Sequence, residues 1–205
     1  MLDRSIPYWN IVMNAPRETL LALPDPALPA GFALRPYQPG DAPRWARLEW
    51  LVGEFSSEEE ALAYFEKQYG PHMKLLQQRC WFVWDVRQEK AVATATAWFD
   101  QQPDGARVAS LHWVSTDPAY QGRGLGRAVT AQALRILARR EPSDLVYLHT
   151  QTWSHKAVSL YLSLGFGAMA AGSFAHYKND YPAYLPILRE KMRPMDYETL
   201  LRTLR

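Results

Sequence analysis

The chain has 205 residues, and its 23 Lys and Arg residues against 21 Asp and Glu residues give a formal net charge of +2. This near-balance argues against a general electrostatic grip on nucleic acid or on an anionic membrane, because either needs a strong basic excess. Hydrophobic residues make up 48% and charged residues 21%, which is typical of a globular chain and excludes an extensively disordered one.

Features that would mark a secreted, metal-binding or membrane protein are lacking in the sequence. The one cysteine, Cys80, rules out an internal disulfide, and no CxxC or HExxH spacing predicts a metal site. Residues 1–30 lack a signal-peptide pattern, and no run of about 18 apolar residues predicts a membrane span. We therefore expect a cytoplasmic protein with no metal and with no membrane or nucleic-acid partner.

The first part of the chain is rich in proline. Residues 1–30 contain five prolines, so we expect an extended arm there with one strand at Tyr8–Met13. Phe32–Tyr37 is expected to follow as a strand. Asp41 is placed to cap a helix that runs to about Val52.

The middle of the chain changes from a helical pattern to a strand pattern. Acidic residues after Ser57 favour a helix start, and this helix is expected to end near Tyr69. Segments rich in aromatic and β-branched residues then predict an antiparallel meander. The further expected elements are a helical stretch at 71–79, strands at 80–86, 91–99 and 108–114, a helix at 124–140, a strand at 145–150, a helix at 154–164, a strand at 172–178 and a helical tail at 182–205 broken at Pro194.

The organisation of the chain is expected to be simple. No internal repeat, low-complexity tract or composition break divides the sequence. We predict one α/β domain over residues 1–205, with an N-terminal arm (1–30), a core (31–171) and a C-terminal extension (172–205).

The segment 115–126 joins a buried strand to a long helix through a glycine-rich turn. The glycines let the backbone approach a ligand closely, and the first N–H groups of the helix favour an anion. Two arginines add positive charge, so this turn predicts binding of a phosphate or pyrophosphate. The residues concerned are Gly122, Arg123, Gly124, Gly126 and Arg127.

Two familiar phosphate loops do not fit this turn. A Walker A loop ends in Gly-Lys-Ser/Thr, and no such ending is present. A dinucleotide fingerprint needs G-x-G-x-x-G, whereas the spacing here is Gly122-x-Gly124-x-Gly126, after a strand expected to be antiparallel.

The turn resembles the signature of the GNAT N-acetyltransferase family. That signature is Gln/Arg-x-x-Gly-x-Gly/Ala, and this chain has Gln121-x-x-Gly124-x-Gly126 between a strand and a helix. A second stretch, about 30 residues on, is similar to the second motif of the family. It reads Ala157-x-x-Leu160-Tyr161-x-x-x-Gly165-Phe166. The resemblance is clear over about residues 80–168.

The resemblance implies a mixed, mostly antiparallel sheet that is splayed near its middle, flanked by helices, with acetyl-CoA as the bound donor. It implies that the backbone of Trp113, Val114 and Ser115 pairs with the pantetheine arm of the donor. It also implies that the turn wraps the pyrophosphate, with Arg127 adding charge beside it. The turn residues are Gln121, Gly122, Arg123, Gly124, Leu125 and Gly126.

The second motif implies two further roles. Tyr161 matches the frequent general acid of the family, which returns a proton to the leaving CoA thiolate. Ser154 stands where many members have an Asn that helps to hold the cofactor or the helix. Serine caps a helix well, so one cofactor contact, rather than the family assignment, is in question.

Acetyl transfer needs a neutral amine, so a base has to remove a proton from the ammonium form. The position at which histone-modifying members carry a Glu is Ser110 here, which cannot serve. His112 shares a strand face with Ser110 and carries an imidazole, a side chain suited to act as a base, and Glu54 lies where the acceptor-binding loop of the family begins. Both stay open as the base. His149 and His155 are more simply explained as polar core or capping residues.

Two functions are compatible with these patterns. The first is an acetyl-CoA-dependent N-acetyltransferase in which a primary amine, most simply that of a small molecule, attacks the thioester directly in a ternary complex. The alternative is a non-catalytic CoA- or acyl-CoA-binding module with the same fold. The aromatic residues could line an acceptor cleft, and the C-terminal extension could support a homodimer.

Overall fold

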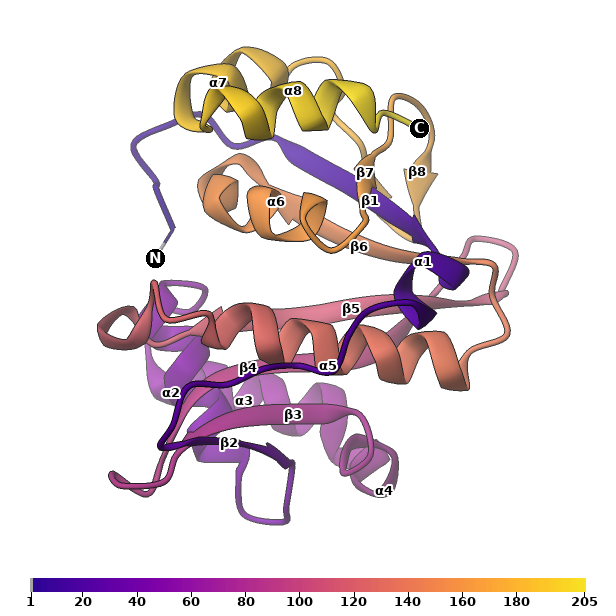
Figure 1. Ribbon diagram of the computed structural model, residues 1–205. Helices are drawn as coiled ribbons and strands as arrows, with labels where there is room; N and C mark the ends of the chain where they lie inside the picture. The colour runs from indigo at the N-terminus through magenta and orange to yellow at the C-terminus, as the bar shows by residue number, and fades with distance from the viewer. Residues whose placement is uncertain (1) are drawn as a thin grey trace. The chain divides into compact units, whose positions relative to one another are not determined.

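A computed structural model describes residues 2–205 of the chain. These residues form two compact units, which are described separately below. The first contains residues 24–97 and 112–136, and the second contains residues 2–23, 98–111 and 137–205. Figure 1 shows how the strands and helices follow one another along the chain.

Seven strands form one mixed sheet in the order β2-β3-β4-β5-β6-β1-β7. The observed pairs β2–β3, β3–β4, β6–β1 and β1–β7 are antiparallel, whereas β5 pairs with β6 in parallel, with Ser110 opposite Tyr147. The predicted mixed α/β fold is therefore confirmed. The strands are β1 (Asn10–Pro16), β2 (Phe32–Pro36), β3 (Cys80–Asp85), β4 (Lys90–Gln101), β5 (Arg107–Thr116), β6 (Leu145–Gln151) and β7 (Gly167–Ala168).

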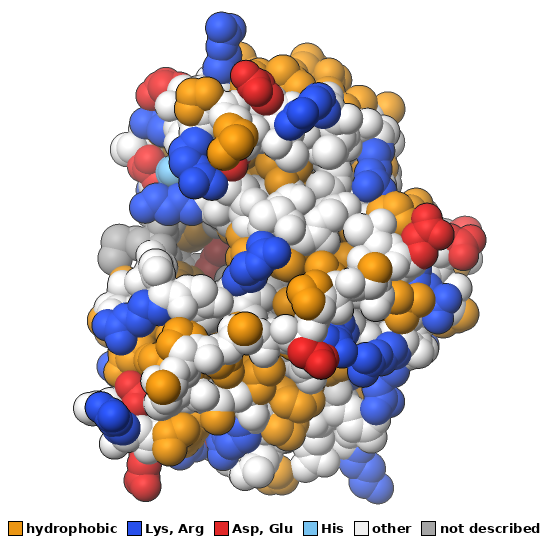
Figure 2. All heavy atoms as spheres, in the orientation of Figure 1, with side chains coloured by type: hydrophobic (Ala, Val, Ile, Leu, Met, Phe, Trp, Pro, Cys, Tyr) orange, Lys and Arg blue, Asp and Glu red, His pale blue; other side chains and the backbone are white. Residues whose placement is uncertain are grey.

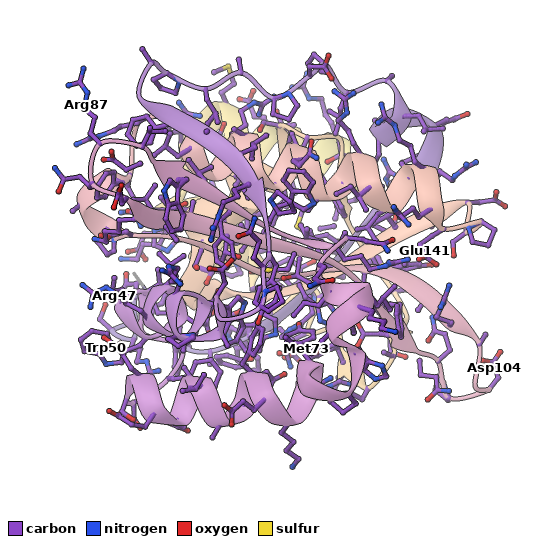
Figure 3. All side chains as sticks on the ribbon, turned by 90° about the horizontal axis from the view of Figure 1, so that it is seen from below. Arg47, Trp50, Met73, Arg87, Asp104 and Glu141 are labelled. Atoms are coloured by element: carbon purple, nitrogen blue, oxygen red, sulfur yellow. The ribbon has the colours of Figure 1, made fainter. Side chains whose placement is uncertain are left out.

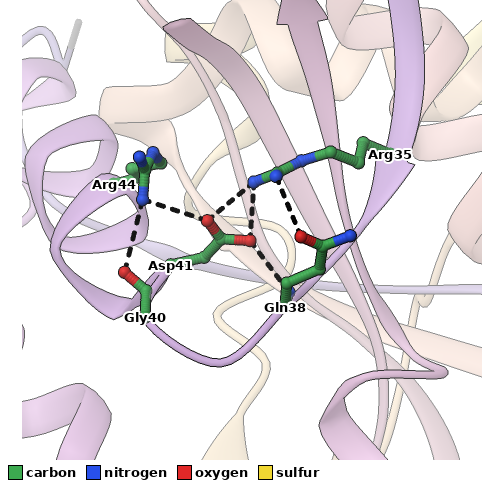
Figure 4. A network of polar contacts seen from close by, with 5 residues as sticks. All are labelled: Arg35, Gln38, Gly40, Asp41 and Arg44. Carbon is green, nitrogen blue, oxygen red and sulfur yellow. Dashed lines mark hydrogen bonds and ion pairs between the residues drawn. The ribbon is translucent and has the colours of Figure 1, made fainter.

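Helix α2 (Ala42–Val52) of the first unit begins where the sequence predicts, but its first turn is held differently. The carboxylate of Asp41 caps no N–H group of the helix. It accepts two hydrogen bonds from Arg35, at 2.6 and 2.7 Å, and others from Arg44 and from the backbone N–H of Gln38 (Figure 4). Asp41 therefore ties β2 to the start of α2. The helix ends at Gly53, whose φ of +93° suits glycine.

Helix α3 (Glu58–Tyr69) confirms the predicted acidic start. The hydroxyl of Ser57 accepts a hydrogen bond from the N–H of Glu60 at 3.1 Å, and three Glu residues fill the first turn. The expected helix at 71–79 is shorter than predicted. It consists of a 3-10 turn (Gly70–His72) and α4 (Met73–Leu76).

The strand predicted at Tyr8–Met13 is confirmed as β1 of the second unit, but it belongs to the sheet and not to an extended arm. It lies between β6 and β7, with Asn10 opposite Gln151 and Pro16 opposite Leu145. Its five central residues are buried, so they belong to the core. A short helix, α1 (Arg17–Leu21), follows and was not predicted.

The C-terminal part of the second unit confirms three predicted helices and corrects one strand. The expected strand at 172–178 is wrong, because the chain forms a hairpin of β8 (Ser173–Phe174) and β9 (Tyr177–Lys178). Pro194 begins the last helix and so separates the two helices of the tail. The helices are α6 (His155–Leu162), α7 (Leu185–Lys191) and α8 (Pro194–Arg202), and α8 packs on α6.

Helix α5 (Leu125–Arg140) follows the glycine turn and is the longest helix among residues 2–205. Within this described part of the chain, no helix is long and apolar enough to cross a membrane. Basic and acidic side chains are interspersed with apolar and uncharged ones on the face shown in Figure 2, in keeping with the small net charge.

Candidate functional site

The turn between β5 and α5 is built on two left-handed glycines in the first unit. Gly122 has a φ of +77° and Gly124 a φ of +79°, a conformation that residues with a side chain rarely adopt. A Cβ atom at either position would meet no heavy atom within 4 Å. The backbone here is exposed and open, so a ligand can approach it closely.

Gly126 is required for a different reason. A Cβ atom at this position would lie 2.7 Å from Thr116 Oγ1, which is closer than real contacts allow. The first turn of α5 therefore packs directly against the end of β5. Thr130 adds a hydrogen bond from its hydroxyl to the carbonyl of Gly126, at 2.7 Å.

A half-buried ion pair holds the start of the turn. Lys90 Nζ lies 2.7 Å from Asp117 Oδ2, and the other oxygen of Asp117 accepts a hydrogen bond from the N–H of Ala119. The N–H of Asp117 in turn donates to the carbonyl of Val92. Strand β4 thus fixes the position from which the glycine turn departs.

The charged and polar residues of the turn lie at its surface. Gln121, Arg123 and Arg127 are exposed, whereas Leu125 is buried and anchors the turn. The side-chain amide of Gln121 donates to the carbonyl of Thr116, and the guanidinium of Arg123 lies 5.1 Å from the centre of the Tyr120 ring. The open backbone, the helix N-terminus and the two arginines together suit an anionic ligand.

Strand β5 contains a strained residue just before the turn. Trp113 has a φ of +50°, which is uncommon for a bulky residue and interrupts the alternation of the strand. Its indole lies 5.1–5.4 Å, between ring centres, from the rings of Trp45, Phe55 and Tyr64. We call these four residues the aromatic cluster. It packs the indole against α2 and α3, so the surrounding structure maintains the strained backbone.

A buried carboxyl group faces β5 two residues further on. Glu49 of α2 is 1% exposed, and its Oε1 accepts a hydrogen bond from Ser115 Oγ at 2.9 Å. Burial raises the pKa of Glu49 to about 8, the charge of Glu54 adds to this effect, and the hydrogen bond from Ser115 opposes it. Glu49 was not predicted as a site residue. The signal available in the sequence is its place four residues after Trp45, on the apolar face of the helix.

The two candidate bases also lie in the first unit. Glu54 is half-buried just after α2, and its N–H donates to the carbonyl of Glu49. His112 is half-buried on β5, next to the strained Trp113. Both have polar or electrostatic partners. Their surroundings do not favour one of them over the other.

The residues of the second motif lie in the second unit. Tyr161 is 6% exposed, and its ring centre lies 6.2 Å from that of Phe166. Ser154 precedes α6 without capping it, since its hydroxyl accepts a hydrogen bond from Gln151 instead. His149 Nε2 lies 2.8 Å from Asn10 Oδ1, and its ring stacks on Tyr177.

Comparison with known proteins agrees with these features. Residues 43–166 match the model of the family described as "Acetyltransferase (GNAT) family". The chain is 32% identical to a mycothiol acetyltransferase of Kineococcus radiotolerans over 73% of this chain and 46% of that protein. It is also 32% identical to one of Thermobispora bispora over 80% of this chain and 55% of that protein.

Solved structures show the same fold. A GCN5-related N-acetyltransferase of Sphaerobacter thermophilus superposes with a TM-score of 0.59 at 21% identity, over 80% of this chain and 49% of that chain. A tandem GNAT protein from the clavulanic acid biosynthesis pathway gives a TM-score of 0.55 at 17% identity, over 80% and 51% of the two chains. The chain spans about half the length of the curated relatives it matches. The match over residues 43–166, together with the strand, glycine turn and helix within it, shows that this chain belongs to the GNAT acetyltransferase family.

Proposed function

We propose that this chain is an acetyl-CoA-dependent N-acetyltransferase, in which a primary amine attacks the thioester directly. The observation that carries the proposal is the turn between β5 and α5, where two left-handed glycines leave the backbone open in front of a helix N-terminus. Membership of the GNAT family supports acetyl-CoA as the ligand.

The proposed donor site uses mainly backbone groups. We assign the pairing with the pantetheine arm to Trp113, Val114 and Ser115, and the binding of the pyrophosphate to the turn from Gln121 to Gly126. Arg123 and Arg127 supply positive charge, which favours the pyrophosphate over a neutral ligand. We assign to Ser154 the place of the family Asn near the donor. A group held in this way brings the thioester to the amine, and such positioning contributes much of the rate.

The proposed acid and base follow the family motifs. Tyr161 is assigned as the acid that returns a proton to the CoA thiolate, because it occupies the motif position of that role. His112 and Glu54 are the candidates for the base. A general base works best when its pKa lies near the working pH. An imidazole or a shielded carboxylate can meet this condition, so both are considered.

The acceptor is proposed to be a small primary amine. The relatives named mycothiol acetyltransferase make a mycothiol-related amine the first compound to test. The proposal further includes one acetyltransferase domain over residues 1–205, a cytoplasmic location and a homodimer formed with the help of residues 172–205. Sedimentation of a species of only 23.5 kDa at micromolar concentration would remove the homodimer.

The proposal is tested first by ligand binding and then by turnover. Thermal unfolding is measured with acetyl-CoA, CoA, ATP and NAD, each at about 100 times its dissociation constant, where a bound ligand adds about 2.7 kcal/mol. A rise with acetyl-CoA and CoA alone supports the donor site. CoA release is then followed with 2-phenylethylamine, glucosamine, a lysine-containing peptide and a mycothiol-related amine. Binding without turnover would favour the non-catalytic module, and no binding would remove both functions.

A further inference from the structure

Glu49 differs from the other buried acidic residues that the structure ties into ion pairs. The carboxylates of Asp41, Asp117 and Glu141 each lie beside a basic side chain, at 2.6–3.1 Å. Glu49 instead accepts a hydrogen bond from the hydroxyl of Ser115. A buried acid without a cationic partner is costly to keep, and such groups concentrate at functional sites.

The geometry of α2 directs Glu49 at the proposed donor strand. Arg47 and Trp50 lie on the outer side of this helix, as Figure 3 shows, whereas Trp45 and Glu49 are buried on its inner side. These two inner residues are one turn apart and face β5, where Trp45 contacts Trp113 and Glu49 contacts Ser115. The inner side of α2 therefore contacts the segment of β5 that we assign to the acetyl donor.

The hydrogen bond fixes the direction of the Ser115 hydroxyl. A carboxylate oxygen only accepts, so the one proton of Ser115 Oγ points at Glu49 Oε1 when Glu49 is ionised. The lone pairs of Oγ then point elsewhere and can accept a second proton. This is the arrangement that a two-step proton transfer needs, with a base behind the hydroxyl that orients and deprotonates it.

We propose that Ser115 and Glu49 form a proton relay for the acetyl transfer, which rests on the function proposed above. Ser115 is the catalytic residue that meets the amine, and Glu49 is the positioning residue that acts through it. The N–H bond of the attacking amine breaks as its proton passes to Ser115 Oγ. The hydroxyl proton of Ser115 passes to Glu49 Oε1, while the nitrogen forms its bond to the acetyl carbon. The C–S bond of the thioester then breaks, and the leaving CoA thiolate takes the proton of Tyr161. Glu49 and Tyr161 return to their starting protonation states by exchange with water. The relay competes with His112 and Glu54 for the role of base.

The surroundings of Glu49 give it a suitable proton affinity. The titratable groups that interact with it include Glu54, beyond the end of α2, and Cys80 on β3. Burial raises the pKa of the Cys80 thiol to about 12, so this group stays neutral. The pKa of Glu49 itself is raised to about 8, so a fraction of this group is ionised at neutral pH and takes up protons readily.

The test compares Glu49→Gln and Ser115→Ala with the wild type across pH 6–10, with 2-phenylethylamine, glucosamine, the lysine-containing peptide and the mycothiol-related amine as acceptors. Gln keeps the size of Glu and an oxygen that accepts from Ser115, but it cannot take up the proton. We expect kcat to fall about 100-fold in both variants, and the titration of kcat near pH 8 to disappear in Glu49→Gln. The KM for acetyl-CoA and the dissociation constant of CoA should stay within about twofold, because the donor is held by backbone groups. Ser115→Thr restores the hydroxyl and should recover part of the rate.

A matched control is Glu141→Gln, which removes another buried carboxyl group, 3% exposed, in the second unit. It should keep kcat and the pH profile. Wild-type kcat and pH profile in Glu49→Gln, or wild-type kcat in Ser115→Ala, would overturn the relay and leave the proposed function intact. A wild-type protein that releases no CoA with any of the acceptors would overturn the proposed function, and the relay with it. If Glu49→Gln fails to fold, Ser115→Ala and Ser115→Thr decide the matter.

Discussion

The glycine turn and the contact between α2 and β5 lie in the same unit, but the turn is open and the contact is tightly packed. At the turn, Gly122 and Gly124 leave the space around the backbone open. At the helix contact, Glu49 and Ser115 are buried and Trp113 is packed among three other rings. The turn has a sequence signature, because backbone conformation restricts its residue types. The contact has none, because it joins residues 66 positions apart.

The largest effect is expected from a substitution that fills the open space of the glycine turn. Gly124→Asp places a carboxylate where we assign the pyrophosphate, so CoA binding should weaken by about 1,000-fold, or about 4 kcal/mol. Isothermal titration with CoA measures this loss. Gly31→Asp is the matched control, since Gly31 has a similar φ of +89° and equally open surroundings. Normal CoA binding by Gly124→Asp would contradict the assignment of the turn.

The contact between α2 and β5 is tested by measuring stability. Glu49→Gln should raise the free energy of unfolding, whereas most substitutions of buried residues lower it. The pKa of this carboxyl rises from 4.5 in the unfolded chain to about 8 in the folded one. Below pH 4.5 it is protonated in both states. Between pH 4.5 and pH 8 the unfolded chain releases the proton and the folded chain keeps it, so wild-type stability falls as pH rises. Gln escapes this loss, and the variant should be more stable by up to about 3 kcal/mol at pH 7.

Denaturant titration at pH 4.5 and at pH 7 measures this difference. The advantage of Glu49→Gln over the wild type should grow between the two pH values. A variant that gains stability while losing turnover shows a residue kept for function at the expense of the fold. An advantage that is the same at both pH values would contradict the burial of an uncharged Glu49.

Much of the fold could be predicted from local patterns, and the errors share one cause. The helix after Ser57 and the long helix after the turn have capping or periodic signals of their own, and both were predicted. A strand was predicted where β1 lies, but it was placed in an extended arm, because its central residues are buried on both faces and show no alternation. Its position in the sheet depends on pairing with β6, which lies far away in the sequence.

The same distinction between local and tertiary determinants applies to the candidate site. The residues of the turn follow from glycine spacing, which is a local property. The left-handed Trp113 was not predicted, because nothing in a tryptophan favours a φ of +50°. The other three rings of the aromatic cluster, which come from α2, α3 and the loop between them, pack against its indole and hold the backbone in place. Strain that tertiary contacts impose leaves little trace in the sequence.

An intermediate effect on stability and CoA binding is expected from the ion pair that joins β4 to the start of the glycine turn. Lys90→Met leaves the carboxylate of Asp117, which is 5% exposed, without its cation. Breaking such a pair should lower the free energy of unfolding by about 2 kcal/mol and weaken CoA binding by about tenfold. Chemical denaturation and CoA titration measure the two effects. Arg47→Met, which removes an exposed pair with Glu58, should cost no more than about 0.5 kcal/mol. Equal effects in both variants would show that the pair does not support the turn.

The smallest expected effect concerns the family Asn that this chain lacks. Ser154→Asn lengthens a side chain whose hydroxyl bonds to Gln151 and caps nothing. The free energy of unfolding should therefore change by less than about 0.5 kcal/mol. If Asn at this position reaches the donor, as in the family motif, CoA affinity should rise by about threefold, which corresponds to about 0.7 kcal/mol. Ser163→Asn, just past the end of the same helix, is the control and should leave CoA affinity unchanged. A loss of CoA affinity in Ser154→Asn alone would mean that the serine itself serves the donor site, and that the departure from the motif is an adaptation of this chain.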